Sequence, residues 1–165
     1  MSEDISRNGT AEPYADLWSR PGFLIRRLHQ LHVAIFLEEC KAFDVTPVQY
    51  AVLSVLYRDR PLDQVSVAAE VGIDRNNAAD VIRRLERRGF VERVQSPTDK
   101  RAKLSRITDE GRRFVEDAHS AMERAQQRLT STLSPADAAT LNELLRRVMV
   151  DNNDAGRAPL RTPEE

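Results

Sequence analysis

Apolar residues recur every three or four positions through most of this chain, which is the period of an α-helix with one buried face. The first such stretch begins at Pro21, and proline is favoured at the first position of a helix. A second begins at Thr46-Pro47, an N-cap residue followed by proline, and ends before Pro61. A long helix is expected after Thr108, and a last one after Ser134-Pro135.

Between the second helix and the long helix the pattern changes twice. Two short helices are separated by Gly72, and the second is capped by Asp74 and stops at Gly89, which is typical of a helix-turn-helix. Residues 90–94 and 103–107 can then pair as strands across a turn-rich loop. The sequence therefore predicts a mainly α fold with a small β-hairpin wing, that is, a winged helix-turn-helix.

These elements suggest a division of the chain. Residues 1–15 and 151–165 are polar and carry prolines without periodicity, so we expect a flexible lead and a flexible tail. Residues 45–108 form the expected winged helix-turn-helix domain. Residues 16–44 and 109–150 carry more apolar surface than one small domain can cover, which predicts a helical dimerisation region.

Composition excludes several classes of protein. Hydrophobic residues make up 41% of the 165 residues and charged residues 31%, as in a folded protein with a core. A single cysteine excludes a disulfide framework, and no apolar run approaches the roughly 20 residues of a membrane span. We expect a cytoplasmic protein associated with the nucleoid. No phosphate loop or paired catalytic carboxylates are found, so an enzyme is not expected and no cofactor is predicted.

Charge is concentrated in one segment although the whole chain carries only −1. Between Ile73 and Thr108 there are ten basic and five acidic residues, a local net charge of +5. Clustered positive charge in a near-neutral chain is typical of a surface that binds a polyanion, most often nucleic acid. An Arg-rich, merely solvated helix is the alternative.

The second helix of the helix-turn-helix predicts a DNA-reading face. With Ala78, Val81, Ile82 and Leu85 facing the core, the other side of the helix presents Arg75, Asn76, Asn77, Ala79, Asp80, Arg83, Arg84 and Arg87. Asparagine can pair with adenine and arginine with guanine or phosphate. Asp80 is unfavourable near phosphates, and we expect it to accept from a cytosine or to orient Arg83 or Arg84. At the wing tip, Lys100 and Arg101 are candidates for the minor groove, and Asp99 is expected to hold an arginine of the helix.

These residues resemble the MarR family of bacterial transcriptional regulators. The resemblance rests on the stretch 74–101, on Asp99-Lys100-Arg101 followed by Thr108-Asp109-Glu110-Gly111, and on Thr46-Pro47-Val48-Gln49-Tyr50. It implies a homodimeric repressor that binds a palindromic operator in double-stranded DNA and is released by a small ligand. Asp80 departs from the family pattern, in which a neutral or basic residue is common.

A second stripe on the first helix suggests a ligand pocket. His29, His32 and Phe36 share this face, and Tyr50 is expected to approach it; such a lining suits a small aromatic acid. Trp18 and Arg20 could add a stacking lid and a carboxylate partner. The segment 18–30 resembles regulators of aromatic and N-heteroaromatic acid catabolism, which implies hydroxylated nicotinates, benzoates or aryl-CoA thioesters as effectors, with 6-hydroxynicotinate as the leading candidate.

Other interpretations stay open at this point. Both histidines could simply be packing residues, or could bind zinc with a third ligand that is not evident. Cys40 could sense oxidants, although Glu38 and Glu39 beside it disfavour a thiolate. A winged-helix module that binds only proteins is the alternative from another class.

Overall fold

The computed structural model describes residues 15–58, 60–99, 101–156, 158, 160 and 161. Its elements are the helices α1 (Pro21–Glu39), α2 (Pro47–Leu56), α3 (Gln64–Val71), α4 (Arg75–Arg87), α5 (Asp109–Leu129) and α6 (Pro135–Asp151), the strands β1 (Val91–Gln95) and β2 (Lys103–Ile107), and the 3-10 turns η1 (Ala15–Ser19), η2 (Lys41–Phe43) and η3 (Asn153–Ala155). The predicted fold class, six helices with one hairpin wing, is confirmed. Within the described part of the chain, no helix is both long and apolar enough to cross a membrane.

Helix starts follow the predicted caps because each cap side chain accepts a bond from a backbone N–H that the helix itself cannot satisfy. The predicted caps Thr46, Asp74, Thr108 and Ser134 all accept such a bond, and Asp63 caps α3 in the same way through the Ser66 N–H. Strand β1 begins one residue later than expected. The Phe90 N–H donates to the Leu85 carbonyl at 3.0 Å and so closes the end of α4 instead of pairing in the sheet.

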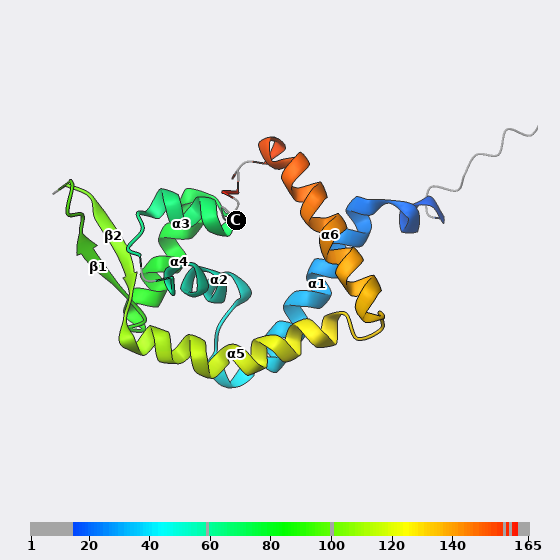
Figure 1. Ribbon diagram of the computed structural model, residues 1–165, viewed down its shortest axis with the longest axis horizontal. Helices are drawn as coiled ribbons and strands as arrows, with labels where there is room; N and C mark the ends of the chain where they lie inside the picture. The colour runs from blue at the N-terminus through cyan, green and yellow to red at the C-terminus, as the bar shows by residue number, and fades with distance from the viewer. Residues whose placement is uncertain (1–14, 59, 100, 157, 159, 162–165) are drawn as a thin grey trace, which may run out of the picture.

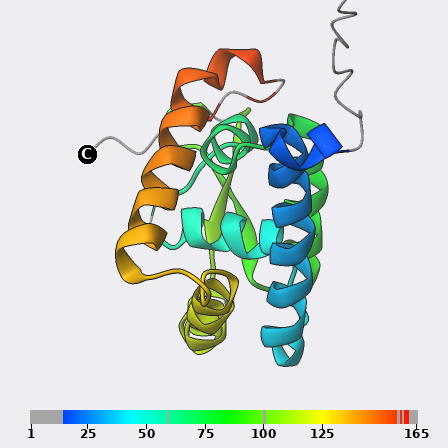
Figure 2. The same ribbon diagram turned by 90° about the vertical axis from the view of Figure 1, so that its right-hand side faces the viewer.

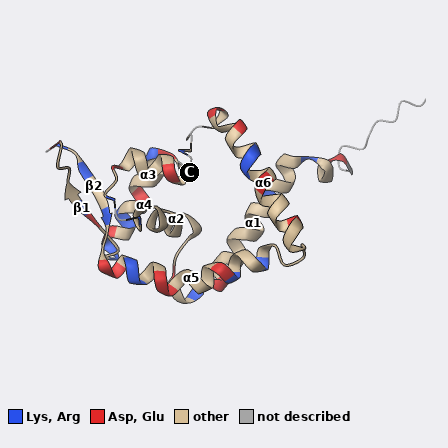
Figure 3. Cartoon of the chain, in the orientation of Figure 1, with Lys and Arg blue, Asp and Glu red and all other residues tan. Residues whose placement is uncertain are grey.

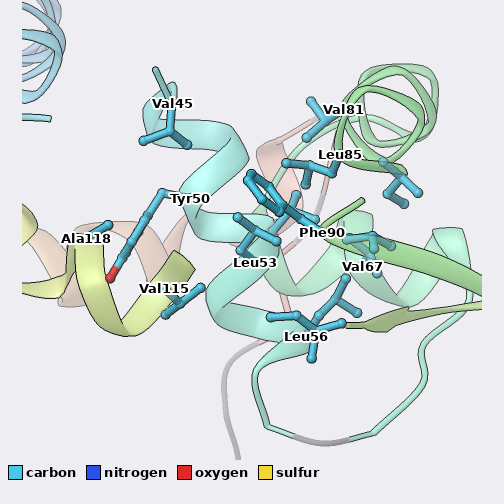
Figure 4. Close-up of a cluster of buried hydrophobic side chains, with 14 of the residues drawn as sticks. Val45, Tyr50, Leu53, Leu56, Val67, Val81, Leu85, Phe90, Val115 and Ala118 are labelled. Atoms are coloured by element: carbon cyan, nitrogen blue, oxygen red, sulfur yellow. The ribbon is translucent and has the colours of Figure 1, made fainter. Parts of the chain in front are cut away.

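The core lies where α2, α4, the sheet and the start of α5 meet (Figure 4). Leu53, Ile82 and Leu85 are fully buried there. The hairpin is antiparallel, with Val91 opposite Ile107, and the Leu62 N–H donates to the Ser105 carbonyl at 3.0 Å, which ties β2 to the segment before α3. The wing is therefore fixed to the helix-turn-helix at its base.

Helix α5 runs from the wing to the other end of the molecule, where α1 and α6 lie (Figure 1). Ion pairs join α1 to α5: Glu39 pairs with Arg124 and with Arg128 at 3.2 Å each. Figure 2 shows α1 and α6 standing on opposite sides, connected through α5. None of the residues of α6, all of which the structure describes, is buried.

The ends of the chain only partly fit the expectation. Residues 1–14 of the expected lead lie outside the described residues. In the described part of the expected tail, α6 extends to Asp151, η3 follows, and the Arg161 N–H donates to the Ala69 carbonyl at 2.7 Å. These contacts are between residues far apart in sequence, so composition alone could not indicate them.

Candidate nucleic-acid interface and ligand pocket

Helix α4 buries one face and exposes the other, as its period predicts. The buried side chains are those of Ala78, Val81, Ile82 and Leu85. The exposed side chains are those of Arg75, Asn76, Asn77, Asp80, Arg83, Arg84 and Arg87, and Ala79 is half-buried among them. Six of these eight positions carry an arginine or asparagine, so the free face of α4 offers donors suited to base edges and phosphates.

Asp80 is paired within the helix. Its carboxylate lies 3.0 Å from the guanidinium of Arg83, one of its two expected partners, and both side chains are more than half exposed. Such a surface pair adds little stability. Its effect is on orientation, because the carboxylate holds the Arg83 fork in place on the exposed face.

Two contacts fix where α4 begins. The Asp74 carboxylate accepts from the Asn77 N–H at 2.9 Å and caps the helix, while the Gln64 side chain donates to the Arg75 carbonyl at 2.9 Å. Gly72 between the two helices has φ +72°, a conformation that favours glycine. The turn thus sets α3 and α4 relative to each other.

The turn of the wing is ordered by its own side chains. Asp99 accepts from the Arg101 N–H at 2.8 Å, and the Asp99 N–H donates to the hydroxyl of buried Ser96 at 3.3 Å. Among the described residues, no hydrogen bond or ion pair joins Asp99 to an arginine of α4, so its expected role in holding such an arginine stays a prediction. Glu86 of α4 and Arg93 of β1 make the link between helix and wing instead, at 3.2 Å.

Basic residues of the wing surround a small hollow. Arg93, Arg101 and Lys103 line one hollow of ≈ 350 Å³. Arg101 is exposed, and Lys100 lies outside the described residues. Arg93 and Lys103 were missed as site residues, although strand alternation places both on one face of the hairpin. Figure 3 shows basic positions on both α4 and β2.

An aromatic run connects α1 to α2. The ring centroids of His32 and Phe36 lie 6.2 Å apart, and those of Phe36 and Tyr50 lie 6.4 Å apart. Phe36 is fully buried and Tyr50 nearly so. The structure therefore brings together the predicted stripe and Tyr50, with the exposed His29 continuing it 6.4 Å beyond His32.

Burial favours the uncharged forms of His32 and Tyr50. Burial lowers the pKa of half-buried His32, and the charge of His29 lowers it further. Burial likewise raises the pKa of the Tyr50 hydroxyl. Both shifts follow from the cost of placing a charge away from water. At neutral pH this end of the run offers an uncharged imidazole and a phenol that can donate a hydrogen bond.

A cavity of ≈ 480 Å³ opens between α2 and α5 beside Tyr50. Its lining residues are Tyr50, Ser54, Tyr57, Val115, Glu116 and His119. Figure 4 shows the Tyr50 side chain directed toward α5. The Tyr57 hydroxyl donates to the Glu116 carboxylate at 2.7 Å, and this bond raises the pKa of Tyr57. Except for Tyr50 these residues were missed, because their proximity arises from the packing of α5 on α2.

Trp18 and Arg20 are not brought to this cavity within one chain. The Trp18 ring packs edge-on against Phe23 with centroids 5.4 Å apart, and Arg20 pairs with Asp16 at 2.7 Å. Trp18 lies in η1, and Arg20 is the N-cap residue of α1, about 24 Å along the helix axis from Phe36 at 1.5 Å per residue. The carboxylate partner of Arg20 in the chain is therefore its own neighbour.

The alternative chemistries gain no support from the geometry. Cys40 is buried, and its burial and the neighbouring Glu39 raise the pKa of its thiol, which disfavours the reactive thiolate. Among the described residues, no three His, Cys, Asp or Glu side chains are grouped so that they could hold a metal ion. Among the described residues, His29 and His32 therefore share a helix face without a third side chain that could complete a metal site.

A helix-turn-helix with an exposed basic second helix, followed by a hairpin wing with Arg101 at its tip, defines a DNA-binding regulator. The profile of the MarR family matches residues 45–103, and the chain belongs to the MarR family. It is a transcriptional regulator and not an enzyme.

Three solved structures illustrate the similarity. The PcaV regulator of Streptomyces coelicolor with its natural ligand is 38% identical with a TM-score of 0.73, and the match covers 81% of this chain and 94% of PcaV. Bordetella bronchiseptica BpsR, whose DNA binding is regulated by 6-hydroxynicotinic acid, is 32% identical with a TM-score of 0.75, covering 78% and 92%. The repressor CouR on a 23-mer DNA duplex is 27% identical with a TM-score of 0.77, covering 84% and 99%. The chain spans 63% of the length of a curated relative from Thauera aromatica.

Proposed function

We propose that this regulator is a homodimeric repressor of a palindromic operator, released by a small aromatic or pyridine carboxylic acid such as 6-hydroxynicotinate. The observation that carries the proposal is the exposed Arg/Asn face of α4 within a winged helix-turn-helix. In this proposal residues 45–108 read DNA, and residues 16–44 and 109–150 form the dimer.

The reading surface combines three kinds of contact. Arg75, Asn76 and Asn77 stand at the start of α4, which in helix-turn-helix proteins is the part of the helix nearest the base edges. Half-buried Ala79 allows close approach to the groove, and Arg83, held by Asp80, presents its fork to a guanine or a phosphate. The wing residues, Arg101 with Lys100, are assigned to the minor groove.

The dimer follows from uncovered apolar surface. Leu24, Ile25 and Leu31 of α1 are 44–50% exposed, and so are Leu144 and Val150 of α6, at 48% each. A chain of this size does not leave two long helices half-exposed in water without a partner. A second copy would cover both helices and place two α4 helices about one DNA turn apart, roughly 34 Å.

The effector site is assigned to the space from His32 to the cavity between α2 and α5. Tyr50 and His119 line the cavity, and the neutral imidazole of His32 lies on the far side of Phe36; together these groups suit a flat ring with a hydroxyl and a carboxylate. BpsR, a relative of similar fold, responds to 6-hydroxynicotinic acid, which supports the same class of ligand here.

The ligand would release the operator by changing the spacing between the two reading domains of the dimer. The cavity lies between α2 of the reading domain and α5, which leads to the dimerisation region. A ligand that binds better at one spacing of the two reading domains shifts the protein toward that spacing. If the favoured spacing does not match the operator, the complex dissociates.

The DNA part is tested with Arg101→Ala, which we expect to weaken operator binding about tenfold and to reduce the salt slope by about one unit. Lys41→Ala, which removes an exposed charge outside the reading surface, is the matched control and should bind as the parent does. Binding is measured by fluorescence anisotropy at several salt concentrations, with the dimer mass checked in parallel. Unchanged affinity of the Arg101 variant would remove the wing from the interface. A parent that binds no duplex would favour a protein-binding module instead.

The effector part is tested by thermal shift with hydroxylated nicotinates and benzoates, and with zinc against a chelator. An acid at 100-fold its dissociation constant should add about 2.7 kcal/mol to the free energy of unfolding. His29→Ala and Tyr50→Phe should keep operator binding and lose most of the ligand response. If both variants respond as the parent does, the pocket is elsewhere; a response to zinc alone would make the histidines metal ligands.

A further inference from the structure

The chain returns to the helix-turn-helix after α6 (Figure 1). The Arg161 N–H donates to the carbonyl of Ala69 at 2.7 Å. Ala69 lies in the last turn of α3, where carbonyls have no partner inside the helix. The C-terminal segment therefore satisfies a backbone acceptor next to the turn that positions α4.

One side chain closes this segment into a loop. Asn153 donates from Nδ2 to the Leu160 carbonyl at 2.9 Å and accepts from the Leu160 N–H at Oδ1, at 2.8 Å. Both hydrogen-bonding groups of the Leu160 backbone are thus held by a residue two positions after the end of α6. This arrangement fixes the return of the chain relative to α6.

The loop packs on the turn between α3 and α4. A Leu160 methyl carbon lies 3.3 Å from the point where a β-carbon on Gly72 would stand. Residues of the turn and of the loop, among them Val71, Gly72, Ala158 and Leu160, line one apolar cavity of ≈ 430 Å³ together with Met149 of α6. The contact is therefore both apolar and hydrogen-bonded.

We propose that the described residues after α6, 153–156, 158, 160 and 161, act as a strap that ties α6 to the helix-turn-helix and so restricts how α4 is oriented relative to the dimerisation helices. The inference rests on the proposed DNA-binding function. Without the strap, the reading domain would be joined to the dimer only through α5 and the connection between α1 and α2. It would then sample more orientations, and this freedom must be lost on binding the operator. The strap removes part of that freedom before DNA arrives.

The strap is tested in the full-length protein with Asn153→Ala, which removes both bonds to Leu160. Asp154→Ala, an exposed neighbour in η3, is the matched control. A second pair compares a chain that ends at residue 156 with one that ends at residue 161. We expect Asn153→Ala and the shorter chain to bind the operator roughly three- to tenfold more weakly, and the two controls to bind as the parent does.

Amide hydrogen exchange by NMR gives a readout that does not depend on DNA. The amides of Leu160 and Arg161 should be protected in the parent and in Asp154→Ala, and should lose that protection in Asn153→Ala. Unprotected amides in the parent would overturn the strap. So would an Asn153→Ala variant that loses this protection yet binds the operator as tightly as the parent or more tightly. Either result leaves the proposed function standing. A parent that binds no duplex would overturn the proposed function, and with it the role of the strap in DNA reading.

Discussion

Arg88 joins three parts of the molecule through one guanidinium. It donates to the carbonyls of Asp44 and Phe43, at 2.5 and 3.0 Å, and lies over the rings of Phe90 and Phe114 with its central carbon 4.7 and 5.5 Å from their centroids. The planar, delocalised cation can satisfy two carbonyls and face two rings at once, which a lysine ammonium cannot. The end of α4 is thereby fixed to the corner between α1 and α2 and to α5.

His32 gives the fold a dependence on pH. Because its pKa is lowered in the folded protein, the unfolded chain binds the proton first as pH falls below about 6.5. The stability contributed by the neutral imidazole is complete above that pH and is lost between it and the lower pKa of the folded state. We expect His32→Gln to flatten the fall in the free energy of unfolding between pH 7 and 5, measured by urea denaturation. His119→Gln, an exposed histidine on α5, serves as the control, and an equal slope in parent and His32→Gln would contradict this account.

At the scale of elements, local signals predicted the helices and missed what depends on packing. Caps such as Thr46 and Thr108 are local, so the starts of α2 and α5 agree with the sequence. The exposed face of α4 follows from its period alone. Within one chain Trp18 lies in η1, several helical turns away from His32 of α1, so its place in an effector pocket stays a prediction. The cavity residues on α5 and the strap depend on contacts across the fold, which no local pattern reports.

The start of α5 tolerates no side chain at Gly111. A β-carbon there would overlap the Phe90 carbonyl oxygen and lie 2.8 Å from a side-chain carbon of Ile107. We expect Gly111→Ala to lower the free energy of unfolding by about 3 kcal/mol, because the wing base would have to move away from α5. In Gly22→Ala the new methyl meets nothing within 4 Å, so that variant should be neutral or stabilised by about 0.5–1 kcal/mol. Chemical denaturation measures both, and similar midpoints for the two variants would refute the close approach.

At the scale of the whole molecule, α6 is an element without a covering surface in its own chain. Leu144, Val148, Met149 and Val150 of this helix are 48–55% exposed, and none of its residues is buried. Helices α1 and α6 stand on opposite sides of the molecule (Figure 2). This open arrangement is expected of a chain whose fold is completed by a second copy.

Leu144→Glu tests that arrangement. A charge in the centre of an apolar interface costs several kcal/mol, so we expect the dimer to dissociate at micromolar concentration and operator binding to fall with it. Asn142→Glu places the same charge at an exposed polar position of the same helix and should leave the dimer intact. Sedimentation velocity gives the mass of each. A dimeric Leu144 variant would place the interface elsewhere.

Trp18 is the only tryptophan of the protein, and it is 63% exposed beside Phe23 at the start of α1. Nearly all intrinsic emission on excitation at long wavelength thus originates at the end of the molecule opposite the wing (Figure 1). The protein therefore carries a native optical probe at the end formed by α1 and α6 and none in the winged helix-turn-helix. A change of that emission on addition of operator would therefore show that DNA binding alters the surroundings of Trp18 at the far end of α5.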